Sequence, residues 1–401
     1  MKQNKHKKVK VFVGLSGGVD SSVAAALLVE QGYDVTGVYM KNWTQDLTGV
    51  KCVWAEDLAD AKRVAVQLGI PFKVYDFQRE YKQRVVDYML DEYRAGRTPN
   101  PDVMCNEMVK FRLFLDCALA DGADFIATGH YAQVGCEQSN GTLSRGHLIS
   151  NELTSTDLSV EVDLIGKSNV GRNAPRKSSI ALLRAVDENK DQTYFLYRVS
   201  AEALGRTLFP IGHLTKPEVR AAARRRGLVT AQRKESMGIC FVGNVGVREF
   251  LSQYVAAESG DIVDERTGEK IGRHDGAIFY TFGQRHGLNV GGGLPYYVVG
   301  KDMKKNEVYV SQNLNDENFW REEVELVDVF LREKLRAGKT YQVRVRHRAP
   351  LVDAEIVKRN ASRKSSTTLS VKFKTPERAI AAGQSIVFYD GELCLGGGIV
   401  K

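Results

Sequence analysis

The first 130 residues alternate between strand-like and helix-like segments, and this alternation constrains the fold more than any other feature. The run KVKVFVG (8–14) is rich in β-branched residues and leads into the Gly/Ser-rich stretch GLSGGVDSS (14–22). A helical pattern follows and ends at Gly32; further strands are expected at 34–40 and 124–130, with an amphipathic helix at 55–69. Strands separated by helices predict an α/β fold with a doubly wound parallel sheet.

The Gly/Ser-rich stretch predicts an anion site. A turn between a strand and a helix collects backbone N–H groups at the positive end of that helix. The stretch lacks the Gly-Lys-Ser/Thr of Walker loops and carries an acidic residue, Asp20. A carboxylate beside a phosphate is repulsive unless a cation lies between them, so we infer Mg²⁺, without assigning its protein ligands. The alternative is a turn that merely caps the helix.

Two of the six cysteines have surroundings that favour reactivity. The six are scattered without a Cys-x-x-Cys pair, so neither a zinc site nor a disulfide framework is expected. Cys105 follows two prolines, and we expect a helix from about Glu107 with Asn106 as its cap, which would favour the thiolate of Cys105. Cys240 follows basic residues, and both a core and a reactive role stay open for it.

The second half of the chain predicts further domains. Residues 136–179 are polar and form an expected surface insertion, whereas short alternating strands from about 295 onward suggest an antiparallel barrel or sandwich. The run RVRHR (344–348) would place three arginines on one strand face, as a phosphate-binding or simply a solvated surface. We predict a nucleotide-binding domain (1–210), a small central domain (211–304), whose segment 223–250 carries Cys240 back to the active site, and a β-barrel (305–401).

Charge and hydropathy narrow the partners. The formal charge of +8 is compatible with a polyanionic partner. No apolar run approaches the roughly 20 residues that span a bilayer, and the basic amino terminus lacks an apolar signal region. A mitochondrial address is the alternative, but about ten basic residues is short for one. We therefore expect a cytoplasmic protein without a membrane partner.

Eight motifs, in this order, resemble the tRNA-specific 2-thiouridylase family of PP-loop ATP pyrophosphatases: SGGVDSS, TPNPDVMCN, TGHYA, DENKDQTYFLY, LFPIGHLTKPEVR, GICFVG, TFGQRHGL and LCLGGGI. The similarity covers nearly the whole chain apart from 136–179. It implies that ATP adenylates the C2 oxygen of uridine 34 in a tRNA anticodon. A persulfide sulfur then displaces AMP, leaving 2-thiouridine. The implied partners are the anticodon stem-loop and a persulfide-donating relay protein.

The resemblance also implies residue roles. Cys240 would receive the persulfide, Cys105 would assist sulfur release through a transient disulfide to Cys240, and Asp102 would be an acid/base. The implied ATP contacts are Gly14, Leu15, Ser16, Gly17, Gly18, Val19, Asp20, Ser21, Met40 and Gly129. The implied tRNA contacts are Asn100, Pro101, Asp102, His130, Lys190, Asp191, Gln192, Arg346, His347 and Gln384. His347 stands where relatives often have Tyr, and AAGQS (381–385) where they often have Pro-Gly-Gln.

Three other functions are alternatives to this interpretation of the loop and the cysteines. Amidotransferase-type ATP pyrophosphatases share the loop but use ammonia, so they have no need for Cys105 and Cys240. A 4-thiouridine synthetase would be expected to carry a separate amino-terminal RNA-binding domain, whereas here the loop begins at residue 14. A tRNA-binding protein with a vestigial nucleotide site is the alternative from another class, and ATP consumption would distinguish it.

Overall fold

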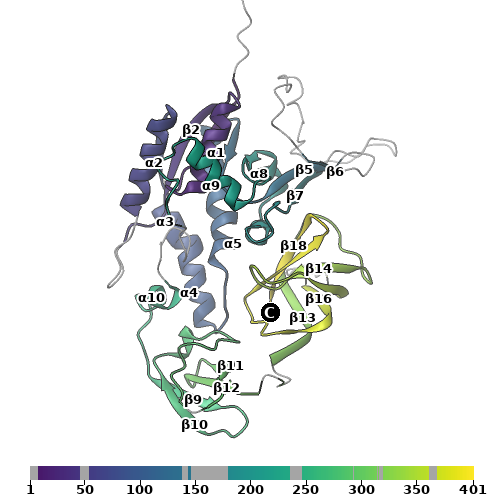
Figure 1. The fold of residues 1–401 in the computed structure, drawn as a ribbon. Helices are drawn as coiled ribbons and strands as arrows, with labels where there is room; N and C mark the ends of the chain where they lie inside the picture. Colours follow the sequence, from purple (N-terminus) through teal and green to yellow (C-terminus); the bar gives the residue numbers. More distant parts are fainter. Residues whose placement is uncertain are drawn as a thin grey trace, which may run out of the picture.

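The computed structural model describes residues 8–45, 54–137, 143–145, 179–234, 246–291, 293–313, 315, 319–360 and 368–401. Three units are visible in Figure 1: an α/β domain, a small sheet domain and a barrel, which meet around the helices α4 and α5. Within the described ranges no helix is both long and apolar enough to cross a membrane.

The α/β domain contains a five-stranded parallel sheet, as predicted. Its order is β3 (Phe72–Asp76), β2 (Asp34–Lys41), β1 (Lys10–Gly14), β4 (Phe125–Ala127) and β8 (Thr207–Leu208). The central strand β1 is almost entirely buried, which explains its continuous apolar sequence. The covering helices include α1 (Val19–Glu30), α2 (Trp54–Leu68) and α9 (Lys216–Arg225).

Strand order reverses at β1, and this reversal creates the binding crevice. The chain passes from β1 outward through β2 and β3, and then returns to place β4 on the other side of β1. The loops after β1 and β4 therefore lie next to each other at the carboxyl edge of the sheet, where doubly wound folds bind ligands. The approach is close: a Cβ on Gly129 would lie 2.6 Å from the backbone nitrogen of Ser21.

Two long helical segments cross beneath this edge. The first consists of α3 (Gln78–Tyr81), a π-helical stretch (Lys82–Val86) and α4 (Asp87–Arg94). The second consists of α5 (Pro101–Cys105), a π-helical stretch (Asn106–Leu113) and α6 (Phe114–Ala120).

The second helical segment begins earlier than predicted. Asn100 is the cap, since its Oδ1 accepts hydrogen bonds from the backbone nitrogens of Asp102 (3.1 Å) and Val103 (3.3 Å). The prediction that Asn106 is the cap and that Cys105 lies ahead of the helix is therefore wrong. Pro101 misled it, because proline at the first helical position starts a helix as readily as it holds a chain extended.

The central unit is a four-stranded sheet in the order β10 (Lys270–His274), β9 (Gly260–Asp264), β12 (Glu307–Ser311) and β11 (Tyr297–Asp302). Helix α10 (Val247–Leu251) and a 3₁₀ turn (Ala277–Phe279) accompany it. The boundary that we predicted at residue 304 falls between the paired strands β11 and β12. We therefore place the end of this unit after Ser311.

The carboxyl-terminal unit is a closed antiparallel barrel, as predicted. Its strands follow the order β13 (Trp320–Leu331), β16 (Thr368–Arg378), β15 (Val352–Asn360), β14 (Thr340–Arg344), β17 (Ser385–Asp390) and β18 (Leu393–Val400), and β13 pairs with β18.

The α/β domain contributes strands to the barrel sheet. Beyond β18 the sheet continues through β7 (Ser179–Leu183), β5 (Gln133–Glu137) and β6 (Leu143–Arg145). The two ends of the predicted insertion therefore join two domains, and the rest of that insertion lies outside the described residues. Two short helices, α7 (Thr193–Leu196) and α8 (Ala201–Gly205), follow β7.

Candidate active site

A cavity of about 400 Å³ opens at the carboxyl ends of β1, β2 and β4, where the strand order reverses. Its volume lies within the range of small-molecule sites. Most of the predicted ATP and tRNA residues line it: Gly14, Leu15, Ser16, Gly18, Val19, Asp20, Ser21, Met40, Asp102, Gly129, His130, Lys190, Gln192 and His347.

The loop after β1 is held by its own serines. Ser21 Oγ accepts a hydrogen bond from the backbone nitrogen of Ser16 (3.2 Å) and donates one to the carbonyl of Gly18 (3.1 Å). Gly17 does not line the cavity; it has a φ of +77°, and a Cβ there would lie 2.5 Å from the carbonyl oxygen of Asp57. Gly17 is therefore required by the approach of α2 and by backbone conformation.

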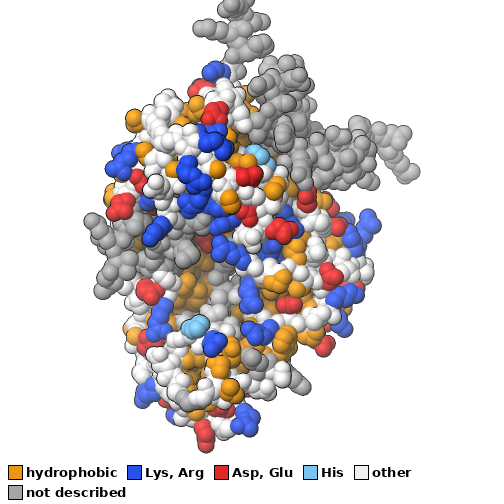
Figure 2. Space-filling model, in the orientation of Figure 1, with side chains coloured by type: hydrophobic (Ala, Val, Ile, Leu, Met, Phe, Trp, Pro, Cys, Tyr) orange, Lys and Arg blue, Asp and Glu red, His pale blue; other side chains and the backbone are white. Residues whose placement is uncertain are grey.

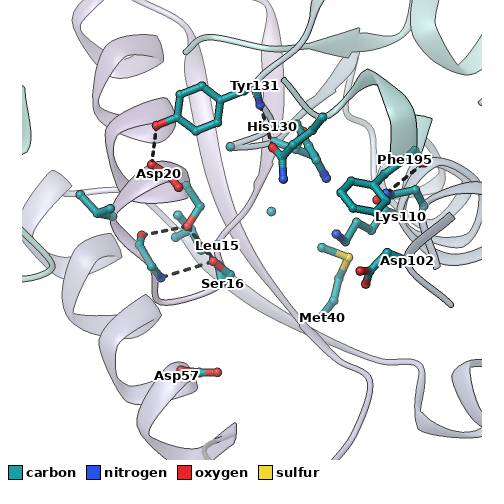
Figure 3. Close-up of a pocket in the computed structure, with 18 of the residues that line it drawn as sticks. Leu15, Ser16, Asp20, Met40, Asp57, Asp102, Lys110, His130, Tyr131 and Phe195 are labelled. Carbon is teal, nitrogen blue, oxygen red and sulfur yellow. Dashed lines mark hydrogen bonds between the residues drawn. The ribbon is translucent and has the colours of Figure 1, made fainter. Parts of the chain in front are cut away.

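A lysine from a distant helix neutralises Asp20. Lys216 Nζ donates to both carboxylate oxygens of Asp20, at 2.7 and 2.8 Å, and Tyr131 Oη donates to Oδ1 at 2.9 Å. Figure 3 shows Tyr131 pointing at Asp20 above the loop. The loop lacks a lysine of its own, but the fold supplies one at the start of α9, within a capping box formed by Thr215 and Glu218.

The opposite side of the cavity is one face of the α5 helical segment. Asp102, Asn106 and Lys110 all line the cavity and follow one another at four-residue spacing. In Figure 3, Asp102 and Lys110 lie together with Met40 and Phe195, apart from Ser16 and Asp20. The cavity therefore has two sides: the loop of residues 14–21, named here the phosphate loop after its predicted ligand, and the face of the α5 helical segment.

Two histidines of the cavity are kept neutral. His130 is buried and its Nδ1 lies 2.8 Å from Thr128 Oγ1; burial, and then the Lys110 ammonium, hold its pKa well below the ordinary value. His347 comes from the barrel and packs against the Phe195 ring with centroids 4.3 Å apart. Burial lowers the pKa of His347 to about 4, with smaller contributions from the charges of Arg348, Arg344 and Lys190.

Asp191 is part of the protein interior. Its side chain is fully buried and accepts hydrogen bonds from the backbone nitrogen and hydroxyl of Thr193, from Ala185 and from Arg344 Nη1 at 3.0 Å. The Asp191 side chain is therefore used inside the protein, and the tRNA contact expected at Asp191 stays a prediction. The prediction of an arginine face at 344–348 is wrong, because β14 ends at Arg344 and this guanidinium is buried against Asp191.

Several other predicted residues lie outside the cavity lining. Asn100 and Pro101 start the helix that lines it, and Cys105 is fully buried among apolar side chains. Arg346 is exposed and Gln384 half-buried, on barrel loops. Cys240 lies outside the described residues.

The sequence interpretation missed other lining residues. Those with polar or aromatic side chains are Tyr39, Asn42, Trp43, Asp57, Asn106, Lys110, Thr128, Tyr131, Phe195, Lys216, Arg233, Lys234 and Arg348. The position of Lys216 could have been predicted locally, because Thr-Lys-Pro-Glu is typical of a helix start and puts the lysine in the first helical turn. Asn106 was noticed only as a cap.

Lysine and arginine side chains gather around the site. Figure 2 shows them over the face that carries α9 and continuing toward the junction of the three units. Arg224 and Arg225, in the last turn of α9, are exposed. Such a surface can attract a polyanion over a larger area than a nucleotide needs.

Comparison with known proteins agrees with this architecture. Residues 9–244 match the family described as the tRNA methyl transferase HUP domain, 248–312 its PRC-barrel domain, and 324–400 the aminomethyltransferase beta-barrel domain. The chain is 43% identical to a protein of Enterococcus faecalis named tRNA-specific 2-thiouridylase MnmA, over 98% of this chain and 96% of the relative. Proteins of the same name from Listeria monocytogenes and Streptococcus sanguinis are also 43% identical, each over 98% of this chain and over 94% and 96% of their own lengths. With all three domains matched and this identity along nearly its whole length, the chain belongs to the tRNA-specific 2-thiouridylase family.

Proposed function

We propose that this chain is a tRNA-uridine 2-sulfurtransferase that thiolates uridine 34 of the anticodon in an ATP-dependent reaction. One observation supports it most: a single cavity joins a phosphate-binding loop to a helix face carrying Asp102, at the junction where a basic surface can receive RNA. The relatives named as tRNA-specific 2-thiouridylases supply the substrate class.

The residues present fit ATP. The loop from Gly14 to Ser21 ends at the positive end of α1, where backbone N–H groups favour phosphate. Gly129 packs so closely on this loop that a side chain there would collide with Ser21. In this proposal the loop holds the β- and γ-phosphates, and Met40 lies beside the adenosine.

Mg²⁺ fits this site only if the protein and the phosphate oxygens of ATP hold it together. In the described part of the chain no group of three or more His, Cys, Asp and Glu side chains could hold a metal. Asp20 would hold Mg²⁺ together with phosphate oxygens, which is a common arrangement for this ion. When bound, the ion would neutralise phosphate charge; Lys216, which now contacts Asp20, can supply positive charge at the same place.

The chemistry assigns each side of the cavity a task. The loop side orients the triphosphate so that the C2 oxygen of uracil attacks the α-phosphorus and pyrophosphate leaves. In this proposal Asp102, on the helix side, accepts the N3 proton that the base loses as its C2 oxygen is adenylated. This step converts a poor leaving group into AMP.

Sulfur transfer involves two cysteines. The terminal sulfur of a persulfide on Cys240 attacks C2, AMP leaves, and the S–S bond breaks as the Cys105 thiolate attacks the Cys240 sulfur to form a disulfide. Cys105 has no exposed surface here, so this attack requires α5 to move. A reductant and a relay protein that reloads Cys240 complete the cycle.

The test is thiolation of an unmodified tRNA transcript with ATP, Mg²⁺ and a persulfide donor, followed by retardation in a mercury-containing gel. A transcript with cytidine at position 34 is the control. We expect a shift that needs both ATP and uridine 34. Absence of both the gel shift and ATP turnover would contradict the proposal and favour a tRNA-binding protein. Release of AMP and pyrophosphate without a shift would indicate another acceptor.

A further inference from the structure

Asn106 has a buried polar atom that the protein itself does not use. The residue is 2% exposed, and its Oδ1 has no hydrogen-bond partner among the described residues. An acceptor left unsatisfied in this way costs about 1–3 kcal/mol. Because Asn106 lines the cavity, a ligand in the cavity can supply the missing donor.

The backbone fixes which amide atom of Asn106 is left without a partner. Asn106 Nδ2 donates to the carbonyl oxygen of Phe195 at 3.2 Å. A carbonyl can only accept, so a flipped amide would place two acceptors against each other and lose this bond. The network therefore orients Oδ1 away from Phe195, as an acceptor of fixed direction.

The surroundings of this acceptor suit a nucleobase. Asp102 and Lys110 stand one helical turn before and after Asn106 on the same cavity face. The Phe195 ring lines the cavity and packs on His347, which gives a flat surface of the kind on which bases stack. In Figure 3, Lys110, Asp102 and Phe195 lie on the side of the cavity away from Ser16 and Asp20, so this group is separate from the phosphate loop.

Uracil and cytosine differ at the atom that such an acceptor would meet. Uracil has a donor, N3–H, between its two carbonyl oxygens, whereas cytosine has an acceptor at N3 and an amino group beyond it. Enzymes that act on an extruded base identify it through hydrogen bonds to this Watson–Crick edge. An acceptor aimed at N3 attracts uracil and repels cytosine.

We propose that Asn106 selects uridine over cytidine by accepting the N3–H of the target base through its Oδ1. The inference rests on the proposed function, since it assumes that the base enters this cavity. Asn106 contacts the base but takes part in no bond change; Lys110 donates to a carbonyl oxygen of the same base. The hydrogen bond to Asn106 orients the base as it binds; when the C2 oxygen is adenylated, this same N3 proton passes to the neighbouring Asp102 carboxylate.

The test measures binding of anticodon stem-loops with uridine, cytidine or 3-methyluridine at position 34, with a non-hydrolysable ATP analogue present. Wild-type protein is expected to bind the uridine form at least about tenfold more tightly than either other form. In Asn106→Leu, which keeps the volume but removes both amide atoms, the uridine-to-cytidine ratio is expected to fall to about one. Its kcat/KM for thiolation of uridine 34 is expected to fall at least about tenfold.

Asn42→Leu is the matched control. Asn42 is another cavity-lining asparagine, 1% exposed, with both amide atoms unpartnered in the described structure, but it follows β2 beside Met40. Its variant is expected to keep the base preference of the wild type. A preference that collapses in Asn106→Leu and persists in Asn42→Leu supports the assignment.

Several results would overturn it. Equal affinity of the wild-type protein for the uridine and 3-methyluridine stem-loops would overturn the assignment. This measurement needs no variant, so it decides the question even if Asn106→Leu fails to fold. The assignment would also be overturned by an Asn106→Leu protein with unchanged base preference, or by one that instead loses selectivity for ATP over GTP, which would make Asn106 a contact of the adenine. A wild-type protein that does not thiolate uridine 34 would refute the proposed function itself, which is a distinguishable result.

Discussion

The buried Asp191–Arg344 ion pair permits a quantitative prediction. Asp191 belongs to the segment before α7 and Arg344 ends β14, so the pair joins the α/β domain to the barrel. Their side chains are 0% and 6% exposed. Asp191→Asn keeps the shape and most hydrogen-bond acceptors but removes the charge that compensates the guanidinium.

The size of the effect follows from what each change leaves behind. Asp191→Asn leaves an uncompensated buried cation, and we expect a loss of about 3–5 kcal/mol. Arg344→Met leaves a carboxylate that still accepts from Ala185 and Thr193, so about 2–3 kcal/mol is expected. In the double variant the Arg344 guanidinium is no longer stranded, although Arg184 still loses its contact with Asp191, and the loss should fall about 2 kcal/mol short of the sum.

The suitable assay is amide hydrogen exchange of peptides that cover β14 and residues 187–197, since local opening free energies need no two-state unfolding of a three-domain chain. The control is Asp390→Asn, whose half-exposed partner Lys339 lies on the barrel surface; we expect less than about 1 kcal/mol there. A loss below about 1 kcal/mol for Asp191→Asn, or additive losses in the double variant, would refute the reasoning.

Three further predictions concern the site. Cys105→Ser and Cys240→Ser should each abolish thiolation while ATP binding, measured by calorimetry, is kept, and Cys117→Ser should stay active; full activity in either of the first two would contradict their roles. Lys216→Met should lower kcat/KM for ATP by about thirtyfold, about 2 kcal/mol, because a charged hydrogen bond at the phosphate loop is lost. The control is Lys73→Met, at an exposed ion pair with Asp121, which should leave this kcat/KM unchanged. Equal effects of the two substitutions would refute a local role for Lys216. His347 has a depressed pKa of about 4 in the folded chain against about 6.5 unfolded, so the stability that it contributes is present above pH 6.5 and is lost as pH falls toward 4. The pKa values of His130 and His274 are lowered as well, so some pH dependence should remain in His347→Phe. The urea midpoint of this variant should fall less between pH 6.5 and 4 than that of the wild type. Equal falls in the two proteins would contradict the assignment.

Local sequence determined the parts of this protein whose physics is local. The apolar run before residue 14, the glycines and serines after it and the helical period that follows specify a strand, a loop and a helix, and these are β1, the phosphate loop and α1. Met40 and Gly129 were implied by the family resemblance instead, and both line the cavity at the edge where the parallel strands end. The barrel strands were recognisable from their alternation.

Only the tertiary structure decided what meets that loop. Lys216 contacts Asp20 across 196 residues, and Arg344 contacts Asp191 across 153. Neither partner can be chosen from sequence, because a lysine or arginine on a strand or helix has the same local pattern whether it faces solvent or a buried carboxylate. For this reason RVRHR was predicted to form a surface, whereas the tRNA contact of Asp191 came from the family resemblance.

The same limit explains the errors around Cys105 and the unrecognised importance of Asn106. A proline before a helix is compatible with an extended chain and with the first helical turn, and only the hydrogen bonds of Asn100 show which occurs. Asn106 became informative once its Nδ2 was seen to bond a carbonyl 89 residues away, leaving Oδ1 without a partner among the described residues. The sequence alone determined the elements and the phosphate loop through short-range backbone preferences. Packing between distant segments decided the charge balance at Asp20, the burial of Asp191 and Cys105, and which amide atom of Asn106 is left unpartnered.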